Sequence, residues 1–115
     1  MKKVIDVAKK IGSPSALTQE QGDTIFKEVR QSILGKELIV LDFANVESII
    51  SPFLNNAIGQ LYGEFTSDDI TTYMKLENFP ENKNKTLNVV ISNAKLFYAN
   101  KKVYEDAVKE VLADE

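Results

Sequence analysis

Six polar residues that lie close together in the sequence carry the most evident binding chemistry of this chain. They are Asn45, Glu47, Ser48, Ser51, Asn55 and Asn56. All but one are uncharged, and Ser51-Pro52 has the residue types that begin an α-helix. The first backbone N–H groups of a helix have no partner inside it, so they can accept an anion or a carboxylate of another protein. We therefore predict that these six residues form a partner-binding edge.

Other acidic residues offer different chemistry, and each has a structural alternative. Asp42 follows an apolar run, where α/β proteins often place functional carboxylates, but it fits better as an acceptor for N–H groups of the next turn. Asp68 and Asp69 could bind a hard cation together with Glu64, although they lack calcium-loop spacing and fit a solvated turn better. The five glycines match no phosphate-binding motif. We predict no metal site and no cofactor.

The chain contains no cysteine and no histidine. It therefore lacks thiol nucleophiles, thiolate metal ligands and the usual general base, and we predict that it is not an enzyme. An enzyme built on carboxylates alone is the alternative. The net charge is −3 and Arg30 is the sole arginine, which argues against nucleic-acid binding.

Length and composition indicate one globular domain spanning residues 1–115. The chain is 43% hydrophobic and 27% charged, as is common in such proteins. No apolar run reaches the length of a membrane span, and the first lysines are not followed by the apolar part of a signal peptide. We expect a cytoplasmic protein without membrane contact.

The predicted edge must be held by a buried strand and by the helix that follows it. Leu38–Leu41 is a short apolar run, typical of a central strand that is covered on both faces. In the helix, Ser51 is expected at the N-cap and Pro52 at the first helical position. Apolar residues then recur at helical spacing over 53–65 and form one buried face.

Local signals refine these elements. Thr18–Gln21 fits a capping box, with Ser15 as an alternative N-cap, and Gly35 is placed as the C′ glycine of the same helix. Gly59 and Gly63 are four residues apart in the central helix. Because glycine destabilises a helix interior by about 1 kcal/mol, the pair indicates close packing; the alternative is that both are merely tolerated.

Elsewhere the hydrophobic pattern predicts strands that alternate with helices. The expected elements are an edge strand over 3–11, a helix from 16–18 to 34, a turn at 66–69, a strand over 70–77, a helix over 81–98 and, after a break near Asn100, a last helix over 103–112. Residues 3–11 could instead be a disordered arm, and 89–91 could begin a strand. The order β-α-β-α-β-α-α indicates an α/β domain with a mainly parallel sheet and crossover helices.

The segment from Leu41 to Leu54 contains a recognisable pattern. Its matching residues are Leu41-Asp42-Phe43, Val46, Ile49, Ser51 and Phe53-Leu54. The pattern resembles that of STAS domains, which occur in anti-sigma-factor antagonists and transporter tails. It is closer still to the STAS-like domains of unknown function in small prokaryotic proteins. The resemblance implies a single small STAS-like domain whose central-helix edge meets a partner kinase.

One part of the STAS pattern is missing. In the antagonists, the serine just before a Gly-Leu pair is phosphorylated by the partner kinase. Aligned on Leu54, this chain has Pro52 at that serine position, Ile50 at the position of the aspartate, and Ser51 one place early. The sequence therefore does not support a phosphorylation switch, and Ser51 is better interpreted as a helix cap.

These observations lead to one functional hypothesis and two alternatives. We expect a non-catalytic regulatory module that docks a signalling protein, such as a histidine-kinase-type ATPase, through the start of the central helix. A small-ligand or nucleotide-sensing module that uses the same helix N-terminus is the first alternative. An enzyme built on carboxylates alone is the second. The apolar last helix could also mediate homodimerisation.

Overall fold

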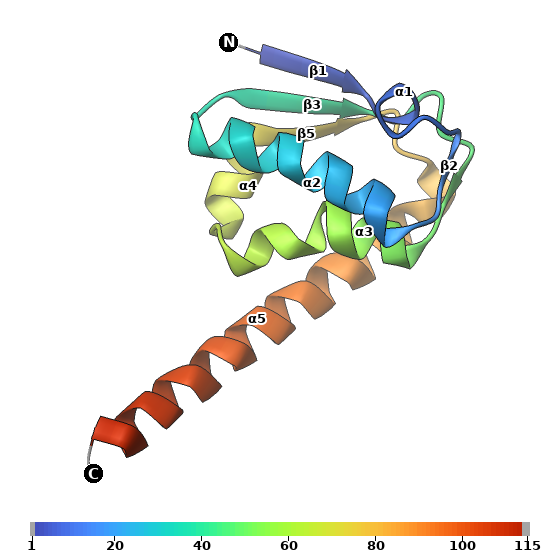
Figure 1. Cartoon of the computed structure of the whole chain (residues 1–115). Helices are drawn as coiled ribbons and strands as arrows, with labels where there is room; N and C mark the ends of the chain where they lie inside the picture. Colours follow the sequence, from blue (N-terminus) through green and yellow to red (C-terminus); the bar gives the residue numbers. More distant parts are fainter. Residues whose placement is uncertain (1, 114–115) are drawn as a thin grey trace.

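The computed structural model describes residues 2–113, with the side chains of residues 2–101. In chain order the elements are β1 (Lys2–Asp6), α1 (Val7–Ile11), β2 (Ser15–Ala16), α2 (Gln19–Leu34), β3 (Leu38–Asp42), β4 (Ser48–Ile49), α3 (Ser51–Ala57), the 3₁₀ turn η1 (Gly59–Gly63), α4 (Ser67–Tyr73), β5 (Met74–Glu77), the 3₁₀ turn η2 (Glu81–Lys83) and α5 (Asn84–Ala113). Figure 1 labels all of them except β4 and the two 3₁₀ turns.

Three parallel strands form the main sheet, in the order β1-β3-β5. Val4 of β1 lies beside Val40 of β3, which lies beside Lys75 of β5. A second parallel pair joins β2 to β4. The parallel pairing with helical crossovers confirms the predicted α/β fold class, with β3 at the centre and β1 at an edge.

The hydrophobic core lies between this sheet and the helices drawn beneath it in Figure 1. Ile39 and Leu41 of β3 belong to that core, and Val40, on the opposite face of the strand, is only 2% exposed. The prediction that this strand is buried on both faces is therefore confirmed. Val4, the neighbour of Val40 on β1, is 57% exposed, so the second face opens towards the edge of the sheet.

The first strand is shorter than predicted. It ends at Asp6, whose Oδ1 accepts a hydrogen bond from the backbone N–H of Lys9 (3.2 Å) and caps α1. Gly12 ends α1 in the left-handed conformation, with a φ of 73°. The prediction of a strand over 3–11 is wrong beyond Asp6, because a carboxylate at an N-cap stabilises a helical turn.

Helix α2 begins as predicted and ends differently. The N–H of Gln21 donates to Thr18 Oγ1 (3.1 Å) and the N–H of Thr18 donates to Gln21 Oε1 (3.0 Å), which completes the capping box. Gly35 has a φ of −85°, whereas Lys36 is left-handed with a φ of 54°. The C′ assignment of Gly35 is therefore wrong, because the helical hydrogen bonding continues one residue further, from Lys36 N–H to the carbonyl of Ile33.

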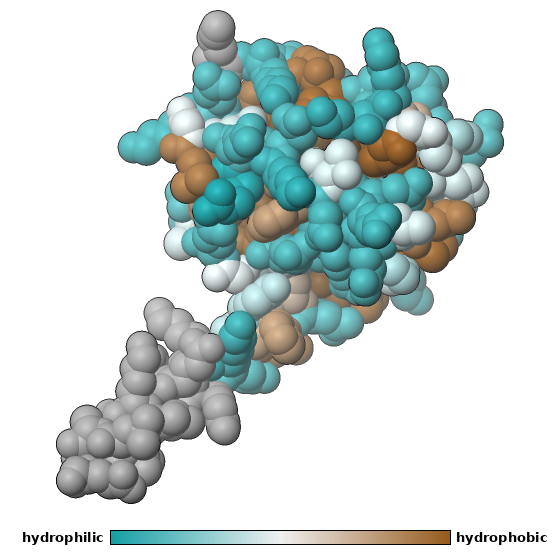
Figure 2. All heavy atoms as spheres, viewed as in Figure 1, coloured by the Kyte–Doolittle hydropathy of each residue, from teal (hydrophilic) through white to brown (hydrophobic). Residues whose placement is uncertain are grey.

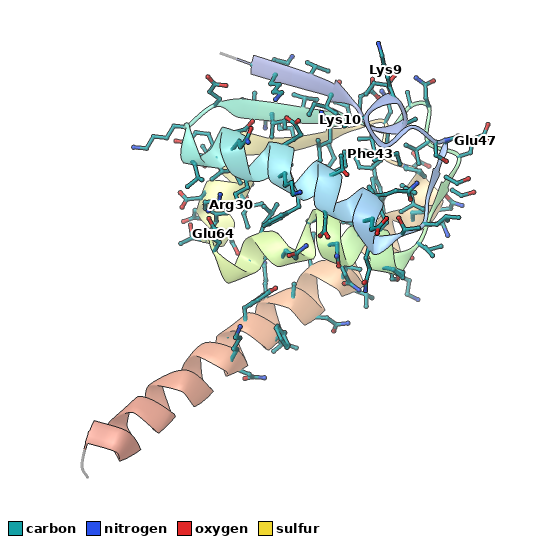
Figure 3. The ribbon with its side chains drawn as sticks, viewed as in Figure 1. Lys9, Lys10, Arg30, Phe43, Glu47 and Glu64 are labelled. Atoms are coloured by element: carbon teal, nitrogen blue, oxygen red, sulfur yellow. The ribbon has the colours of Figure 1, made fainter. Side chains whose placement is uncertain are left out.

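Ion pairs join α2 to its neighbours on two sides. Glu28 pairs with Lys10 of α1 (2.8 Å) and with Lys3 of β1. Both lysines lower the pKa of Glu28 below its ordinary value, and Lys10 has the larger effect. The Glu28 side chain is only 18% exposed. Arg30 pairs with Glu64, which follows η1 (2.9 Å), and Figure 3 shows these two side chains together.

The central helix differs from the prediction at both ends. Ser51 is its first residue and not its cap, because the chain enters α3 directly from the extended residue Ile50 and no side chain caps the helix. The helix ends at Ala57 and continues as the 3₁₀ turn η1, so it does not reach residue 65. Gly59 and Gly63 lie in η1, and their weak helix propensity accounts for the loss of regular α-helical geometry.

Residues 67–73 form a capped helix where a turn and a strand were predicted. Thr66 Oγ1 accepts a hydrogen bond from the backbone N–H of Asp69 (3.1 Å), and Ile70 is buried in the core. Thr71 and Thr72 donate their hydroxyl groups to carbonyl oxygens four residues earlier (2.6 and 2.7 Å). These local hydrogen bonds outweigh the strand preference of threonine, so only β5 remains of the predicted strand.

Helix α5 is continuous from Asn84 to Ala113, so the predicted break near Asn100 is wrong. The alternative strand start at 89–91 is also wrong, since these residues lie inside the helix. Figure 1 shows the later part of α5 extending away from the sheet and the other helices. The side chains over 103–112, and with them the dimer contact predicted there, lie outside the described residues.

Candidate interaction site

The six residues of the predicted binding edge fall into two groups with different surroundings. Asn45, Glu47 and Ser48 lie in the connection from β3 through β4, at the carboxyl end of the sheet. Asn55 and Asn56 lie on α3 and face α5 across a groove. The remaining residue, Ser51, is the first residue of α3 and lies between the two groups. It is exposed, and its side chain does not cap the helix.

The first group holds the connection between β3 and β4 in place. Asn45 Nδ2 donates to Asp6 Oδ2 (3.0 Å), and the backbone N–H groups of Glu47 and Ser48 donate to the carbonyl oxygen of Pro14 (2.7 and 3.3 Å). Figure 3 shows Glu47 at the outer margin of the molecule. Asn45 therefore has a structural partner, while the side chains of Glu47 and Ser48 are on the surface.

Asp42 stabilises the same end of the sheet. Its Oδ1 accepts hydrogen bonds from Asn78 Nδ2 (3.0 Å) and from the backbone N–H of Ala44 (2.9 Å). These two hydrogen bonds lower the pKa of the Asp42 carboxyl below its ordinary value, and the bond from the Asn78 amide has the larger effect. The geometry supports the structural interpretation of Asp42, with Ala44 as the backbone donor.

A repeated arrangement links the strand ends. Asp6 ends β1 and receives the amide of Asn45, which follows β3. Asp42 ends β3 and receives the amide of Asn78, which follows β5 and has a φ of 56°. Each aspartate is therefore hydrogen bonded to an asparagine that follows the neighbouring strand of the sheet.

The second group belongs to a shallow groove between α3 and α5. The groove has a volume of about 260 Å³ and is lined by Asn55, Asn56, Gly59 and Gln60 from α3 and η1 and by Asn93, Ala94, Phe97 and Tyr98 from α5. Four of these side chains are carboxamides and two are aromatic, and none carries a charge at neutral pH. The groove therefore offers hydrogen-bonding groups beside apolar surface.

Asp23 of α2 orients the carboxamides on one side of the groove. Its Oδ1 accepts hydrogen bonds from Asn56 Nδ2 (3.0 Å) and Gln60 Nε2 (2.8 Å). Helix α2 can approach this closely because Gly22 has no side chain: a Cβ atom there would lie 2.6 Å from the carbonyl oxygen of Phe53. Within residues 2–101, no group donates to the side-chain oxygens of Asn56 and Gln60, which remain free as acceptors.

Glycine also brings the two walls of the groove together. An added Cβ atom would lie 3.6 Å from Ala94 Cβ at Gly59 and 2.5 Å from Tyr98 Cε1 at Gly63. The prediction that Gly59 and Gly63 pack closely is therefore confirmed, with α5 as the neighbour. Because α5 lies against η1 at these points, Asn93 comes to face α3 across the groove.

The α5 wall also exposes a large apolar side chain, since Phe97 is 60% exposed. Leu96, which precedes it on α5 and is 63% exposed, does not line the groove. The rings of Phe97 and Tyr98 meet edge to face, with centroids 4.9 Å apart and an interplanar angle of 84°. Phe97 thus lines the groove with a ring that is largely accessible.

Sequence analysis alone does not identify this wall of the groove. The helical pattern places both Phe97 and Tyr98 on the buried face, whereas in the structure Tyr98 is half-buried and Phe97 is exposed. Neighbouring residues in a helix point about 100° apart, so two adjacent aromatic residues cannot both face the core squarely. That pair is the signal in the sequence that one ring is on the surface.

A second hollow, of about 470 Å³, shares Tyr98 with the groove. It is lined by Tyr62, Gly63, Phe65, Ser67, Lys95, Tyr98, Ala99 and Lys101. Lys95 Nζ lies 5.7 Å from the centre of the Tyr62 ring, and burial raises the pKa of the Tyr62 hydroxyl above its ordinary value. This hollow combines aromatic rings with two lysines and so differs from the uncharged groove.

The described part of the chain contains neither a cluster of metal-ligating side chains nor a membrane-spanning helix. There, no three acidic side chains lie close enough together to hold a metal ion, and Asp68 and Asp69 lie exposed in the first turn of α4. None of the helices within residues 2–113 combines the length and the apolar character needed to cross a membrane.

Comparison with known proteins identifies the family. A family model described as a STAS-like domain of unknown function (DUF4325) matches residues 21–84, from α2 to the first residue of α5. No curated protein and no solved structure matches the chain significantly. The matched segment is more than half of the 115 residues and includes the Leu41–Leu54 pattern, so the resemblance predicted from that pattern is confirmed. The chain belongs to the family of STAS-like domains of unknown function.

Proposed function

We propose that this chain is a non-catalytic regulatory module of the cytoplasm that docks a signalling protein in the groove between α3 and α5. The groove contains Asn55 and Asn56 of the predicted site. The observation that carries the proposal is that Phe97, which lines the α5 wall of this groove, is 60% exposed. Large apolar side chains beside uncharged polar groups are typical of protein–protein interfaces.

The surface of the molecule supports this choice of face. Figure 2 shows that the side over α2 is mainly hydrophilic, whereas hydrophobic surface is visible close to where α5 leaves the body. Asn45, Glu47, Ser48 and Ser51 are a secondary contact region in this proposal, because none of them lines the groove. The absence of histidine and cysteine supports a role without catalysis.

The class of partner is inferred from the family. The STAS resemblance makes a histidine-kinase-type ATPase the first candidate. Because Pro52 stands where STAS antagonists have the phosphorylated serine, we propose that docking here does not depend on phosphorylation of this chain.

Site-specific photo-crosslinking tests the docking surface. A photoreactive amino acid placed at Asn55 should capture a signalling ATPase in cells, and the capture should be lost when Phe97→Arg is added. The control position is Asn88, which is exposed on α5 outside the groove lining. Equal capture from both positions, or capture that is indifferent to Phe97→Arg, would show that the groove is not the docking surface.

A second function is favoured by the hollow around Tyr62. Aromatic rings can stack on a base, and Lys95 and Lys101 could pair with phosphate groups, so this hollow suits a nucleotide. Its position differs from the helix N-terminus at which the sequence suggested ligand binding. Thermal-shift measurements over a nucleotide panel should then show that a nucleotide stabilises the wild type. Lys95→Glu should abolish this stabilisation, whereas the control Lys27→Glu, at an exposed position on α2, should retain it. A flat response of the wild type would exclude this function.

A further inference from the structure

We infer that the α3–α5 groove binds an extended, uncharged peptide segment of its partner through the peptide backbone, with one large apolar side chain of that segment against Phe97. This inference rests on the proposed function and adds the chemical class that the groove selects. Three properties of the groove carry it: its carboxamides, its lack of charge and its exposed apolar wall.

The carboxamides match the peptide unit. A side-chain amide presents one N–H donor group beside one carbonyl acceptor, which is the complement of a backbone C=O and N–H. Asn56 and Gln60 already donate to Asp23, so they offer their oxygen atoms as acceptors for backbone N–H groups. Asn55 and Asn93 are exposed on the two facing walls and make no side-chain hydrogen bond within the described residues, so they can both donate and accept.

The absence of charge selects a neutral segment. None of the lining residues is ionised at neutral pH, and Asp23, the nearest carboxylate in the hydrogen-bond network, is already engaged by two amide donors. A charged side chain or a phosphate group entering the groove would lose water without gaining a counter-charge. The groove therefore discriminates against acidic, basic and phosphorylated segments.

The exposed ring of Phe97 provides a contact for an apolar side chain of the peptide. Phe97 lines the groove on α5 and is 60% exposed. An aliphatic or aromatic side chain of a bound peptide would bury this ring. The contact with Tyr98 restrains the Phe97 ring, which lowers the entropy that is lost when a ligand packs on it.

Selection from a random peptide library tests this inference. A phage-displayed library of twelve-residue peptides is panned on the purified full-length chain, and enriched sequences are synthesised with blocked ends for fluorescence anisotropy. We expect the enriched peptides to have no net charge and at least one large apolar residue. Asn55→Asp keeps the shape of the wall but adds a negative charge, and it should weaken binding at least tenfold, as should Phe97→Ala.

Matched controls separate binding from folding. Asn88→Asp makes the same chemical change on an exposed part of α5 outside the groove and should alter binding less than twofold. Circular dichroism should show that all variants remain folded, since Asn55 and Phe97 are exposed. In addition, an enriched peptide that is phosphorylated in its core, or that has a glutamate inserted there, should bind the chain at least tenfold more weakly.

Three results would overturn the inference. The first is that the selection enriches charged peptides or enriches no peptide at all. The second is that Asn55→Asp and Phe97→Ala leave the affinity for the enriched peptides unchanged. The third is binding on a glycan array that the same variants abolish, which would assign the groove to sugars. If photo-crosslinking at Asn55 still captures a partner while any of these occurs, the docking function stands and only the peptide class is wrong.

Discussion

Replacing Gly22 with alanine is expected to destabilise the domain, although alanine is the better helix former. Gly22 is buried in α2 where this helix meets α3. A Cβ atom added there would lie 2.6 Å from the carbonyl oxygen of Phe53, 2.7 Å from Asn56 Cβ and 3.0 Å from the backbone nitrogen of Ala57. Two of these atoms belong to the backbone of α3, so no side-chain rotation can relieve the contact.

The size of the effect follows from opposing contributions. Helix propensity favours alanine by about 1 kcal/mol. Non-bonded carbon atoms rest about 3.5–4.0 Å apart, so α3 must shift by roughly 1 Å. Overpacking of this kind costs about 1–3 kcal/mol. The shift also strains the hydrogen bonds of Asn56 and Gln60 to the Asp23 carboxylate, each of which contributes about 1.5–3 kcal/mol. We expect a net loss of about 2–4 kcal/mol, or about 8–16 °C in Tm.

Urea unfolding followed by circular dichroism measures this loss. The matched control is Gly35→Ala, since Gly35 is exposed at the end of α2, has a φ of −85°, and would place its Cβ no nearer than 3.4 Å to another atom. That variant should stay within about 0.5 kcal/mol of the wild type or gain slightly. If Gly22→Ala is as stable as the wild type while the control behaves as expected, the close approach of α2 and α3 is refuted.

Four further substitutions test local features of the fold. Glu28→Gln removes the negative charge shared by two lysines and should lower the free energy of unfolding by about 0.5–2 kcal/mol at pH 7 and low salt. The pKa of Glu28 in the folded protein is lowered from 4.5, so the extra stability of the wild type should disappear as the pH falls through 4.5 to the folded value. Urea titrations at several pH values would measure this change. Asp42→Asn should lower the Tm at neutral pH, and the difference should vanish at a pH below the lowered folded pKa of Asp42; a difference that is independent of pH would contradict the assigned hydrogen bonds. Thr66→Ala should lower the free energy of unfolding by about 1 kcal/mol, because it removes the cap of α4. Ser51→Ala should change it by no more than about 0.5 kcal/mol, because Ser51 caps no helix. If urea unfolding shows the larger loss for Ser51→Ala, Ser51 is the helix cap that the sequence predicted.

The features that local residue chemistry determines were predictable from the sequence. The Thr18 capping box needs only residues three apart, and β3 needs only a short apolar run between polar ends. The parallel sheet follows from strands alternating with helices, and the STAS-like pattern at 41–54 is a continuous segment. For the capping box, β3 and the 41–54 pattern, the signal and the structure that it predicts lie in the same stretch of chain.

The errors arose where two local preferences competed. At 66–73 the threonines favour a strand by propensity, but hydrogen bonds from their hydroxyl groups and the cap at Thr66 favour a helix. At Ser51 the residue types Ser-Pro favour a helix that begins at Pro52, but Ile50 is the last extended residue and Ser51 is already helical. Neither competition can be resolved from residue types alone.

The candidate site was predictable only in part because its walls come from distant segments. Asn55 and Asn56 were identified from the start of α3, but Asn93 and Phe97 join them because α5 lies against η1, where Gly63 leaves room for Tyr98. Asn45 does not line this groove and is hydrogen bonded to Asp6, which is 39 residues away in sequence. Such contacts require the tertiary arrangement.

The asparagine–aspartate hydrogen bonds at the strand ends also bear on how the domain opens. One fastens β1 to the residues after β3, and the other fastens β3 to the residues after β5, across 39 and 36 positions of sequence. Because β3 takes part in both, either outer strand can detach while the other stays bound. The amide protons of β3 should therefore exchange with solvent only on global unfolding, whereas those of β1 and β5 should exchange through separate partial openings of lower free energy.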